Sequence, residues 1–306
     1  MISDRPLTGI LLMLGFCILA PMGDSIAKLL VDTIPLGQLV LIRFAVQAAV
    51  LLPLVWWTGH SLALAPRVLW LTLIRTLLHI CGIGAMFLSL RYLPLADAIA
   101  IAFVMPFIML LLGKYVLGEE IGPRRLGACI VGFIGTLLVI QPSFAAVGAP
   151  ALLPLFVAVV FALFMLVTRT IAKAADPVAL QTVSGLMACV ILAPVLLSAE
   201  VFDWPGLDPI APVGADWALL VALGLLGTLA HLLMTWSLRF APSATLAPMQ
   251  YLEIPFATIF GWLVFRDFPN GLALVGIGVT VAAGLFIVIR ERSLSRAPAP
   301  VSPPAA

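Results

Sequence analysis

Hydrophobic positions run along this chain in long blocks, and charged residues, prolines and glycines separate one block from the next. A helix needs about 20 mainly apolar residues to cross the hydrocarbon core of a bilayer. The pattern therefore predicts an all-α polytopic membrane protein with ten transmembrane helices. The expected spans lie near 7–31, 36–57, 68–90, 94–117, 124–141, 150–170, 177–198, 216–238, 243–265 and 270–290.

The second half of the pattern repeats the first. The stretch LSLRYLP at Leu88–Pro94 recurs as WSLRFAP at Trp236–Pro242, an offset of 148 residues, and Pro106 recurs as Pro255 at an offset of 149. Because each half holds five spans, an odd number, the second half enters the membrane in the opposite orientation. We therefore predict two inverted five-helix repeats and, after them, a Pro/Ala/Ser-rich disordered cytoplasmic tail. The expected units are 1–142, 143–292 and 293–306.

Composition supports the bilayer as the solvent of this chain. Of its 306 residues 63% are hydrophobic and 10% are charged, whereas soluble domains carry about 25% charged residues. The net charge of +2 and the lack of a basic run argue against nucleic acid as a partner. The cysteines lack metal-ligand or disulfide spacing, so we expect small core residues and neither metal nor cofactor. They are Cys17, Cys81, Cys129 and Cys189.

Lys and Arg near the span ends predict the orientation, because they are enriched in cytoplasmic loops. With a cytoplasmic N-terminus, ten of these residues fall in the cytoplasm and three outside. We therefore expect a multi-pass protein of the inner (cell) membrane with both termini in the cytoplasm. The turn that carries Glu119, Glu120, Arg124 and Arg125 is then expected to be a solvated cytoplasmic loop.

Polar residues inside the spans are candidate functional groups, because burying charge in hydrocarbon is costly. Asp24 and Lys28 are four residues apart and share one helix face, so they can neutralise each other or bind a cargo. Glu253 lies ten residues into its span, roughly 15 Å deep, in a helix that Pro248 and Pro255 are expected to kink. The candidate substrate-binding residues are Asp24, Lys28, Arg43, Arg75, His79, Trp236, Gln250, Tyr251 and Glu253.

The charges of this set indicate a class of cargo. Asp24 and Glu253 against Lys28, Arg43 and Arg75 leave one excess positive charge, which favours a carboxylate or phosphate on the cargo. Charges of both signs favour a zwitterion, and Trp236 and Tyr251 offer aromatic faces for a cation. The alternative roles are structural. The aromatic residues and His79 could serve only in packing, and the arginines could serve only to neutralise buried carboxylates.

The stretch at 75–142 resembles the EamA-type drug/metabolite transporter superfamily. A proline opens one helix (Pro94), a second interrupts it (Pro106), and Gly118-Glu119 follows, ahead of a glycine-rich helix. The second copy has Arg266-Asp267 in place of Gly-Glu. APMGDSIAKLL at 20–30, with LIRF and LIRTLL, is similar to the branch that includes S-adenosylmethionine uptake carriers. The resemblance implies ten helices in two inverted repeats.

These observations predict a secondary, non-ATP transporter of a small polar metabolite, zwitterionic or anionic, that is amino-acid-like or S-adenosylmethionine-like and moves by alternating access. An exporter of amino acids or drugs on the same fold is an alternative, and a non-transporting membrane scaffold is another. We expect no enzyme, since HExxH, Gly-x-Ser-x-Gly and nucleotide-binding motifs are absent from the sequence. The expected partners are a small-molecule substrate and the lipid bilayer, with a coupling proton and a homodimer left open.

Overall fold

The computed structural model describes residues 5–120, 122–140, 148–202, 208–267 and 271–296, and within them the regular elements are all helical. The first half contains α1 (Pro6–Leu30), α2 (Leu36–Thr58), α3 (Pro66–Leu90), α4 (Leu95–Ala102), α5 (Met105–Leu117) and α6 (Pro123–Ile140). The second half contains the 3-10 turn η1 (Ala149–Leu152), α8 (Leu153–Ile171), α9 (Pro177–Phe202), α10 (Asp216–Phe240), α11 (Ser243–Gln250), α12 (Glu253–Phe260), the π-helical turn η2 (Gly261–Phe265) and α13 (Gly271–Arg296).

Each of the ten expected apolar blocks is helical, two of them as broken helices. The block at 94–117 is divided into α4 and α5, and the block at 243–265 into α11, α12 and η2. Among the described residues, seven helical segments are long and apolar enough to cross a membrane. Helix α13 continues to Arg296, so residues 293–296 of the expected tail are helical, while 297–306 lie outside the described residues.

Proline and glycine set several helix boundaries. Pro6 and Pro66 occupy the first position of α1 and α3, where a missing N–H costs no helical hydrogen bond. Gly59 and Gly118 end α2 and α5 in the left-handed conformation, with φ of 69° and 65°, which glycine adopts without a side-chain clash. These residues place the chain reversals at the ends of the bundle.

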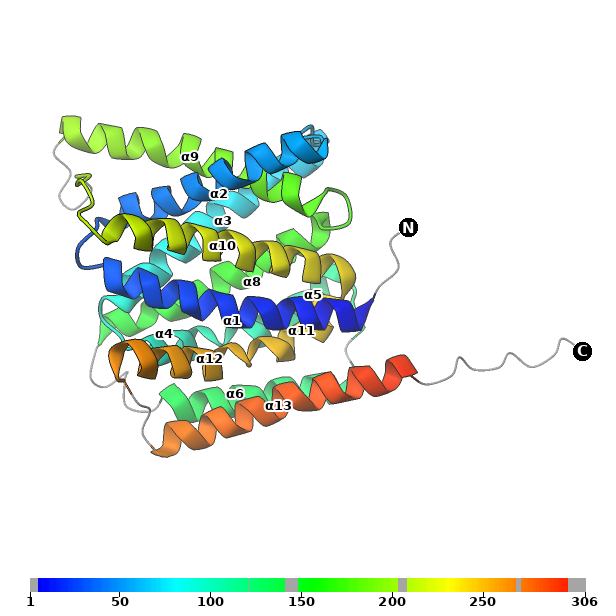
Figure 1. Cartoon of the computed structure of the whole chain (residues 1–306). Helices are drawn as coiled ribbons and strands as arrows, with labels where there is room; N and C mark the ends of the chain where they lie inside the picture. Colours follow the sequence, from blue (N-terminus) through cyan, green and yellow to red (C-terminus); the bar gives the residue numbers. More distant parts are fainter. Residues whose placement is uncertain (1–4, 121, 141–147, 203–207, 268–270, 297–306) are drawn as a thin grey trace, which may run out of the picture.

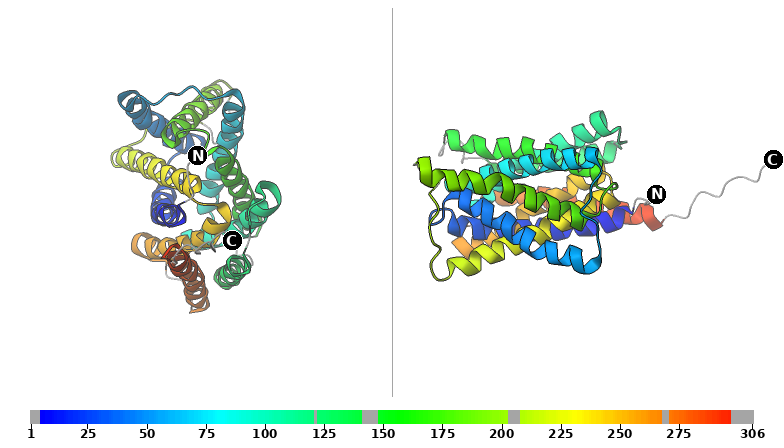
Figure 2. Two further views of the ribbon diagram at one scale, coloured as in Figure 1. Left: turned by 90° about the vertical axis from the view of Figure 1, so that its right-hand side faces the viewer. Right: turned by 90° about the horizontal axis from the view of Figure 1, so that it is seen from above.

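The helices lie roughly along one direction, as the end-on view shows (Figure 2). The first residues of α1 and the last of α13 are at the same end of the bundle (Figure 1). Helix α1 packs on α10 and α3 packs on α8, while α2 pairs with α9 and α6 pairs with α13. The α6/α13 pair forms one edge of the bundle (Figures 1 and 2).

The outer surface is rich in large apolar side chains. Trp57 is 88% exposed, and Trp56 and Trp70 are also exposed, at neighbouring ends of α2 and α3. Tryptophan is enriched where a membrane meets water. This surface suits lipid, and it leaves the polar side chains described below on the inside of the bundle.

Candidate functional site

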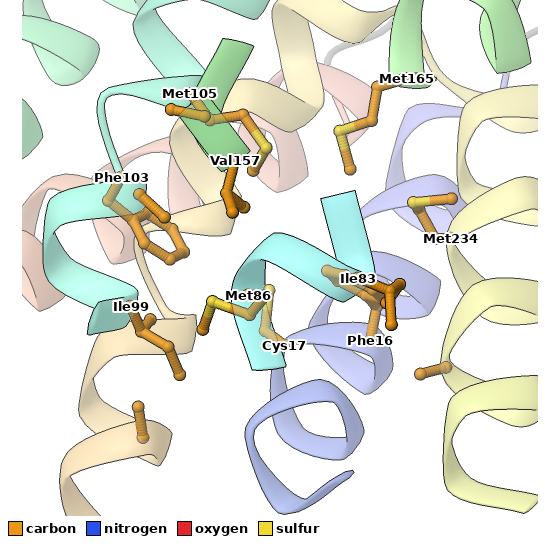
Figure 3. Packing of buried hydrophobic residues seen from close by; sticks show 14 of the residues in the cluster. Phe16, Cys17, Ile83, Met86, Ile99, Phe103, Met105, Val157, Met165 and Met234 are labelled. Atoms are coloured by element: carbon orange, nitrogen blue, oxygen red, sulfur yellow. The ribbon is translucent and has the colours of Figure 1, made fainter. Parts of the chain in front are cut away.

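A partly open cavity of about 70 Å³ lies inside the bundle, between helices of both halves. Its polar lining consists of Asp24 of α1, Arg43 of α2, His231 of α10 and Glu253 of α12. The remaining walls are mainly apolar and aromatic, and several of their side chains converge on a common interior (Figure 3). Those walls include Phe16, Ile83, Met86, Phe87, Ile99, Phe103, Met105, Val157 and Phe161.

Arg43 provides the positive charge of the cavity. Its side chain is 2% exposed, and Nη2 lies 2.9 Å from Nδ1 of His231 and donates to the carbonyl oxygen of Gly227 at 3.5 Å. Nη1 is buried without a hydrogen-bond partner among the described residues. A guanidinium carries five N–H donors, so Arg43 keeps donors available for a further oxygen ligand.

Two carboxylates share this cavity with Arg43. Asp24 and Glu253 both line it, and in the part of the chain that the structure describes neither forms a hydrogen bond or an ion pair within 4.0 Å. Unpaired carboxylates are costly to bury. Their position beside a guanidinium with a free donor is typical of a site that binds a polar ligand or a proton rather than of a closed structural pair.

Two histidines pack side by side at this cavity, His231 in its lining and His79 outside it. The rings of His79 and His231 have centroids 4.3 Å apart, and Phe44 and Phe164 also contact His79. Nδ1 of His231 lies 2.9 Å from both Nη2 of Arg43 and the carbonyl oxygen of Gly227. In one tautomer it accepts from the guanidinium, and in the other it donates to the carbonyl. Both nitrogens of His79 and Nε2 of His231 are buried without a partner in the described chain.

Arg75 lies outside the cavity lining and is bound by neutral oxygens. Nε donates to Thr168 at 2.8 Å, Nη1 to Ser184 at 2.8 Å, and Nη2 to Gln181 at 3.1 Å and to Thr235 at 3.4 Å. The guanidinium also lies over the ring of Phe164, 4.6 Å from its centroid. These hydrogen bonds join α3 to α8, α9 and α10, and a part of Arg75 in binding cargo stays a prediction.

The other expected residues also lie away from the cavity lining. Lys28 donates to the carbonyl of Leu93 at 2.9 Å and lies 4.0 Å from the carboxylate of Asp267, so its ion pair in the described chain is with Asp267 and not with Asp24. Trp236 packs beside a cluster of α2, α9 and α10 residues. The two remaining residues pack inside the bundle, with Gln250 against the sulfurs of Met109 and Met165 and Tyr251 donating to the carbonyl of Cys129.

The structure adds residues that the sequence pattern alone did not assign to the site. The sequence places two histidines, His79 and His231, inside the spans, and only the packing of α10 on α1 and α2 brings His231 to Arg43. Gly227 is the residue that admits the guanidinium, because a Cβ there would lie 2.8 Å from Nε of Arg43. The signal available in the sequence was the one-turn spacing of Gly227 and His231.

Comparisons with known proteins agree with this architecture. A riboflavin transporter of Rhizobium johnstonii is 31% identical over 75% of this chain and 74% of its own length. An S-adenosylmethionine uptake transporter of Rickettsia felis is 25% identical over 94% of each chain, and the pseudopaline exporter CntI of Pseudomonas aeruginosa is 25% identical over 97% of this chain and 99% of its own. A crystal structure matches with a TM-score of 0.68 at 20% identity, over 94% of this chain and 98% of that one. At that identity the structural match describes the fold alone.

An all-helical chain with several apolar helices around a buried polar cavity is a multi-pass membrane protein. The EamA-like transporter family model matches residues 7–141 and 149–289. The chain belongs to this family, within the drug/metabolite transporter superfamily, and is a small-molecule membrane transporter. The names of the family and of the relatives indicate transport rather than enzymatic catalysis.

Proposed function

We propose that this protein is a secondary carrier of small polar metabolites that bear both an anionic and a cationic group. The observation that carries the proposal is the composition of the cavity. It combines the guanidinium of Arg43 with two carboxylates, and among the described residues neither Nη1 of Arg43 nor either carboxylate has a hydrogen-bond or ion-pair partner. A guanidinium binds carboxylate or phosphate in bidentate fashion. We assign Arg43 to the anionic group of the cargo, and Asp24 and Glu253 to its cationic group or to a coupling proton.

The size of the cavity supports alternating access. Pockets that hold drug-sized ligands measure roughly 300–1,000 Å³, whereas this cavity measures about 70 Å³. A metabolite of that size needs a wider cavity than this conformation offers, which favours a mechanism in which helices separate at one end of the bundle. Four phenylalanines in the walls (Phe16, Phe87, Phe103 and Phe161) provide aromatic faces for a ring or a cation of the cargo.

The helix contacts favour ten spans arranged as two inverted repeats. With α8 as the counterpart of α1 and α10 as the counterpart of α3, the α1/α10 contact and the α8/α3 contact are the same interface made twice. The breaks after α4 and after α11 fall at corresponding places in the two halves. We assign the shared end of α1 and α13 to the cytoplasmic side of the inner membrane, as the positive charges near the span ends favour.

Uptake into proteoliposomes tests this function directly. We expect the purified protein to move S-adenosylmethionine or a zwitterionic amino acid, assayed as labelled compounds in both directions, and transport of uncharged riboflavin alone would contradict the proposed cargo class. Arg43→Ala and Glu253→Gln are expected to reduce transport of that cargo by roughly 10²-fold or more, because they remove groups that orient it. Glu120→Gln, at an exposed position, is the matched control. Wild-type rates in both Arg43→Ala and Glu253→Gln would contradict the site, and no transport of a broad metabolite panel would favour the scaffold.

A further inference from the structure

We propose that two ion-pair locks, Glu119–Arg169 at one end of the bundle and Lys28–Asp267 at the other, join the two halves and open in turn during transport. The proposal rests on the alternating-access function given above and identifies the contacts that would govern each side. Both locks connect a residue of the first half to a residue of the second. Glu119 follows α5 and contacts the start of α11, whereas Lys28 is in the last turn of α1, and these helix ends lie at opposite ends of the bundle (Figure 1).

The Glu119 lock is closed in this conformation. The Glu119 carboxylate accepts from Nε of Arg169 at 3.2 Å, from the hydroxyl of Ser243 at 2.6 Å, and from the backbone N–H groups of Ser243 at 3.2 Å and Ala244 at 2.9 Å. Arg169 also donates to the carbonyl of Leu238 at 2.6 Å. The expectation of a solvated loop is therefore wrong for Glu119, because its carboxylate caps the first turn of α11.

The Lys28 lock is looser. The ammonium lies 4.0 Å from the carboxylate of Asp267, donates to the carbonyl of Leu93 at 2.9 Å, and sits 5.1 Å from the ring centre of Phe265. The Asp267 side chain is 50% exposed, whereas those of Glu119 and Arg169 are 11% and 12% exposed. The Lys28 side chain is 18% exposed, so one partner of this pair is half exposed and the other is not. An ion pair at this separation with an exposed partner contributes little stability, so this lock is the weaker of the two.

The two acidic residues occupy equivalent places in the two halves. Glu119 follows Gly118 (φ 65°), and Asp267 follows Arg266 (φ 61°), the one non-glycine residue with positive φ among those described. The N–H of Glu119 donates to the carbonyl of Gly113 at 3.0 Å, and the N–H of Asp267 donates to the carbonyl of Gly261 at 3.3 Å. All three corresponding positions differ by 148 residues, so one turn geometry places a carboxylate at each end.

This equivalence explains a departure in the sequence. The second copy has Arg266-Asp267 where the first has Gly118-Glu119, yet the acid and the left-handed turn are both kept. Positive φ costs a non-glycine residue of order 1–3 kcal/mol and persists only where the surroundings impose it. The retained strain favours a role for the position of Asp267 beyond loop closure.

The cavity lies close to the Lys28 lock. Asp24 and Lys28 are one helical turn apart, about 6 Å along α1, and Asp24 lines the cavity. Opening the Lys28–Asp267 contact would therefore uncover the cavity from that end while the Glu119 lock remains closed. The reverse state requires Glu119 to release Arg169 and the start of α11.

Thiol labelling from each side of the membrane distinguishes locks from static supports. A reporter Ala20→Cys, in the cavity wall, is placed in a variant whose four native cysteines are replaced, and a membrane-impermeant maleimide is applied to oriented vesicles. We expect Glu119→Gln to increase labelling from the Glu119 end about fivefold or more, the lower range of coupling between two states. Asp267→Asn is expected to increase labelling from the Lys28 end, and Glu120→Gln is expected to change neither.

A second variant keeps the test decisive if Glu119→Gln does not fold. Arg169→Gln breaks the ion pair but leaves the Glu119 cap on α11, and we expect the same gain of labelling from the Glu119 end. If the variants lowered the melting temperature but were labelled from each end as much as the reporter protein with both ion pairs intact, the proposal of two locks would be overturned. Labelling requires no cargo, so a protein that transports nothing can still show the switch, and the two proposals fail independently.

Discussion

At the scale of single residues, the fit between Gly227 and Arg43 determines where the guanidinium lies. A Cβ at Gly227 would stand 2.8 Å from Nε and 2.9 Å from Nη2 of Arg43. We expect Gly227→Ala to leave the protein folded, because the tip of a long side chain can move, and to reduce transport by roughly 10²-fold, the cost of misplacing a binding group by about 1 Å. Gly84→Ala on α3, where nothing lies within 4 Å, is the control. Unchanged transport kinetics in Gly227→Ala would contradict this placement of Arg43.

For Arg75 we predict an effect on stability, because its hydrogen bonds join α3 to three other helices. Each bond to a charged group contributes about 1.5–3 kcal/mol, and a lysine ammonium has only three donors at one point. We expect Arg75→Lys to lower the melting temperature of the detergent-purified protein, while the folded fraction keeps its affinity for cargo. The exposed Arg67 provides the control Arg67→Lys. Weaker cargo binding at unchanged stability would place Arg75 in the site instead.

The sequence predicted the charged residues of the interior but not how they combine. Asp24, Arg43 and Glu253 line one cavity, and their role in binding cargo stays a prediction. The spacing of Asp24 and Lys28 permits a pair on one helix, yet the ammonium of Lys28 finds Asp267. Spacing along a helix defines a face, whereas partners from the other half of the chain depend on packing that no local pattern contains.

At the scale of elements, the breaks in the two central helices follow from proline. Pro106 and Pro255 lack an N–H, so neither can donate to the carbonyl four residues earlier. The two carbonyls belong to Ala102, the last residue of α4, and to Tyr251, the residue that follows α11. The apolar blocks were predicted from hydrophobicity, and the location of each break follows from the proline within it.

Tyr251 anchors the second of these breaks to α6. Its side chain is fully buried, its hydroxyl donates to the carbonyl of Cys129 at 3.2 Å, and a Cβ at Gly132 would lie 2.5 Å from its ring. We expect Gly132→Ala to lower the melting temperature strongly, because a buried aromatic ring cannot move aside. Tyr251→Phe should cost only about 1 kcal/mol, one hydrogen bond, with unchanged cargo affinity. Thermal melts and binding titrations of both variants check this, and a large loss of affinity in Tyr251→Phe would return Tyr251 to the site.

At the scale of the whole molecule, the repeat explains how distant charges meet. The internal offset of 148 residues predicted two related halves, but not that α1 would pack on α10 and α3 on α8. Because helices of each half pack on helices of the other, α1, α2, α10 and α12 surround one cavity. It also places Glu119 and Asp267 at opposite ends, where each meets a cation from the other half.

The orientation of this assembly in the membrane is the remaining expectation that a single measurement can decide. In the structure the connection that contains Ala211 follows α9, whereas Glu120 lies at the opposite end, after α5. Because lysine and arginine concentrate near the Glu120 end, we expect that end to be cytoplasmic. In a cysteine-free variant, Ala211→Cys should react with an impermeant maleimide added to intact cells, and Glu120→Cys should react only after permeabilisation.

Both reporter positions are exposed, so a difference between them reflects the side of the membrane and not burial. The native cysteines are free, and Cys81 is exposed on the bundle surface rather than in the core, which is why their removal is part of the design. The opposite labelling pattern would invert the whole molecule and exchange the two locks between compartments. The cavity, the helix pairs and the two ion pairs would be unaffected, because each follows from contacts inside the chain and not from the side it faces.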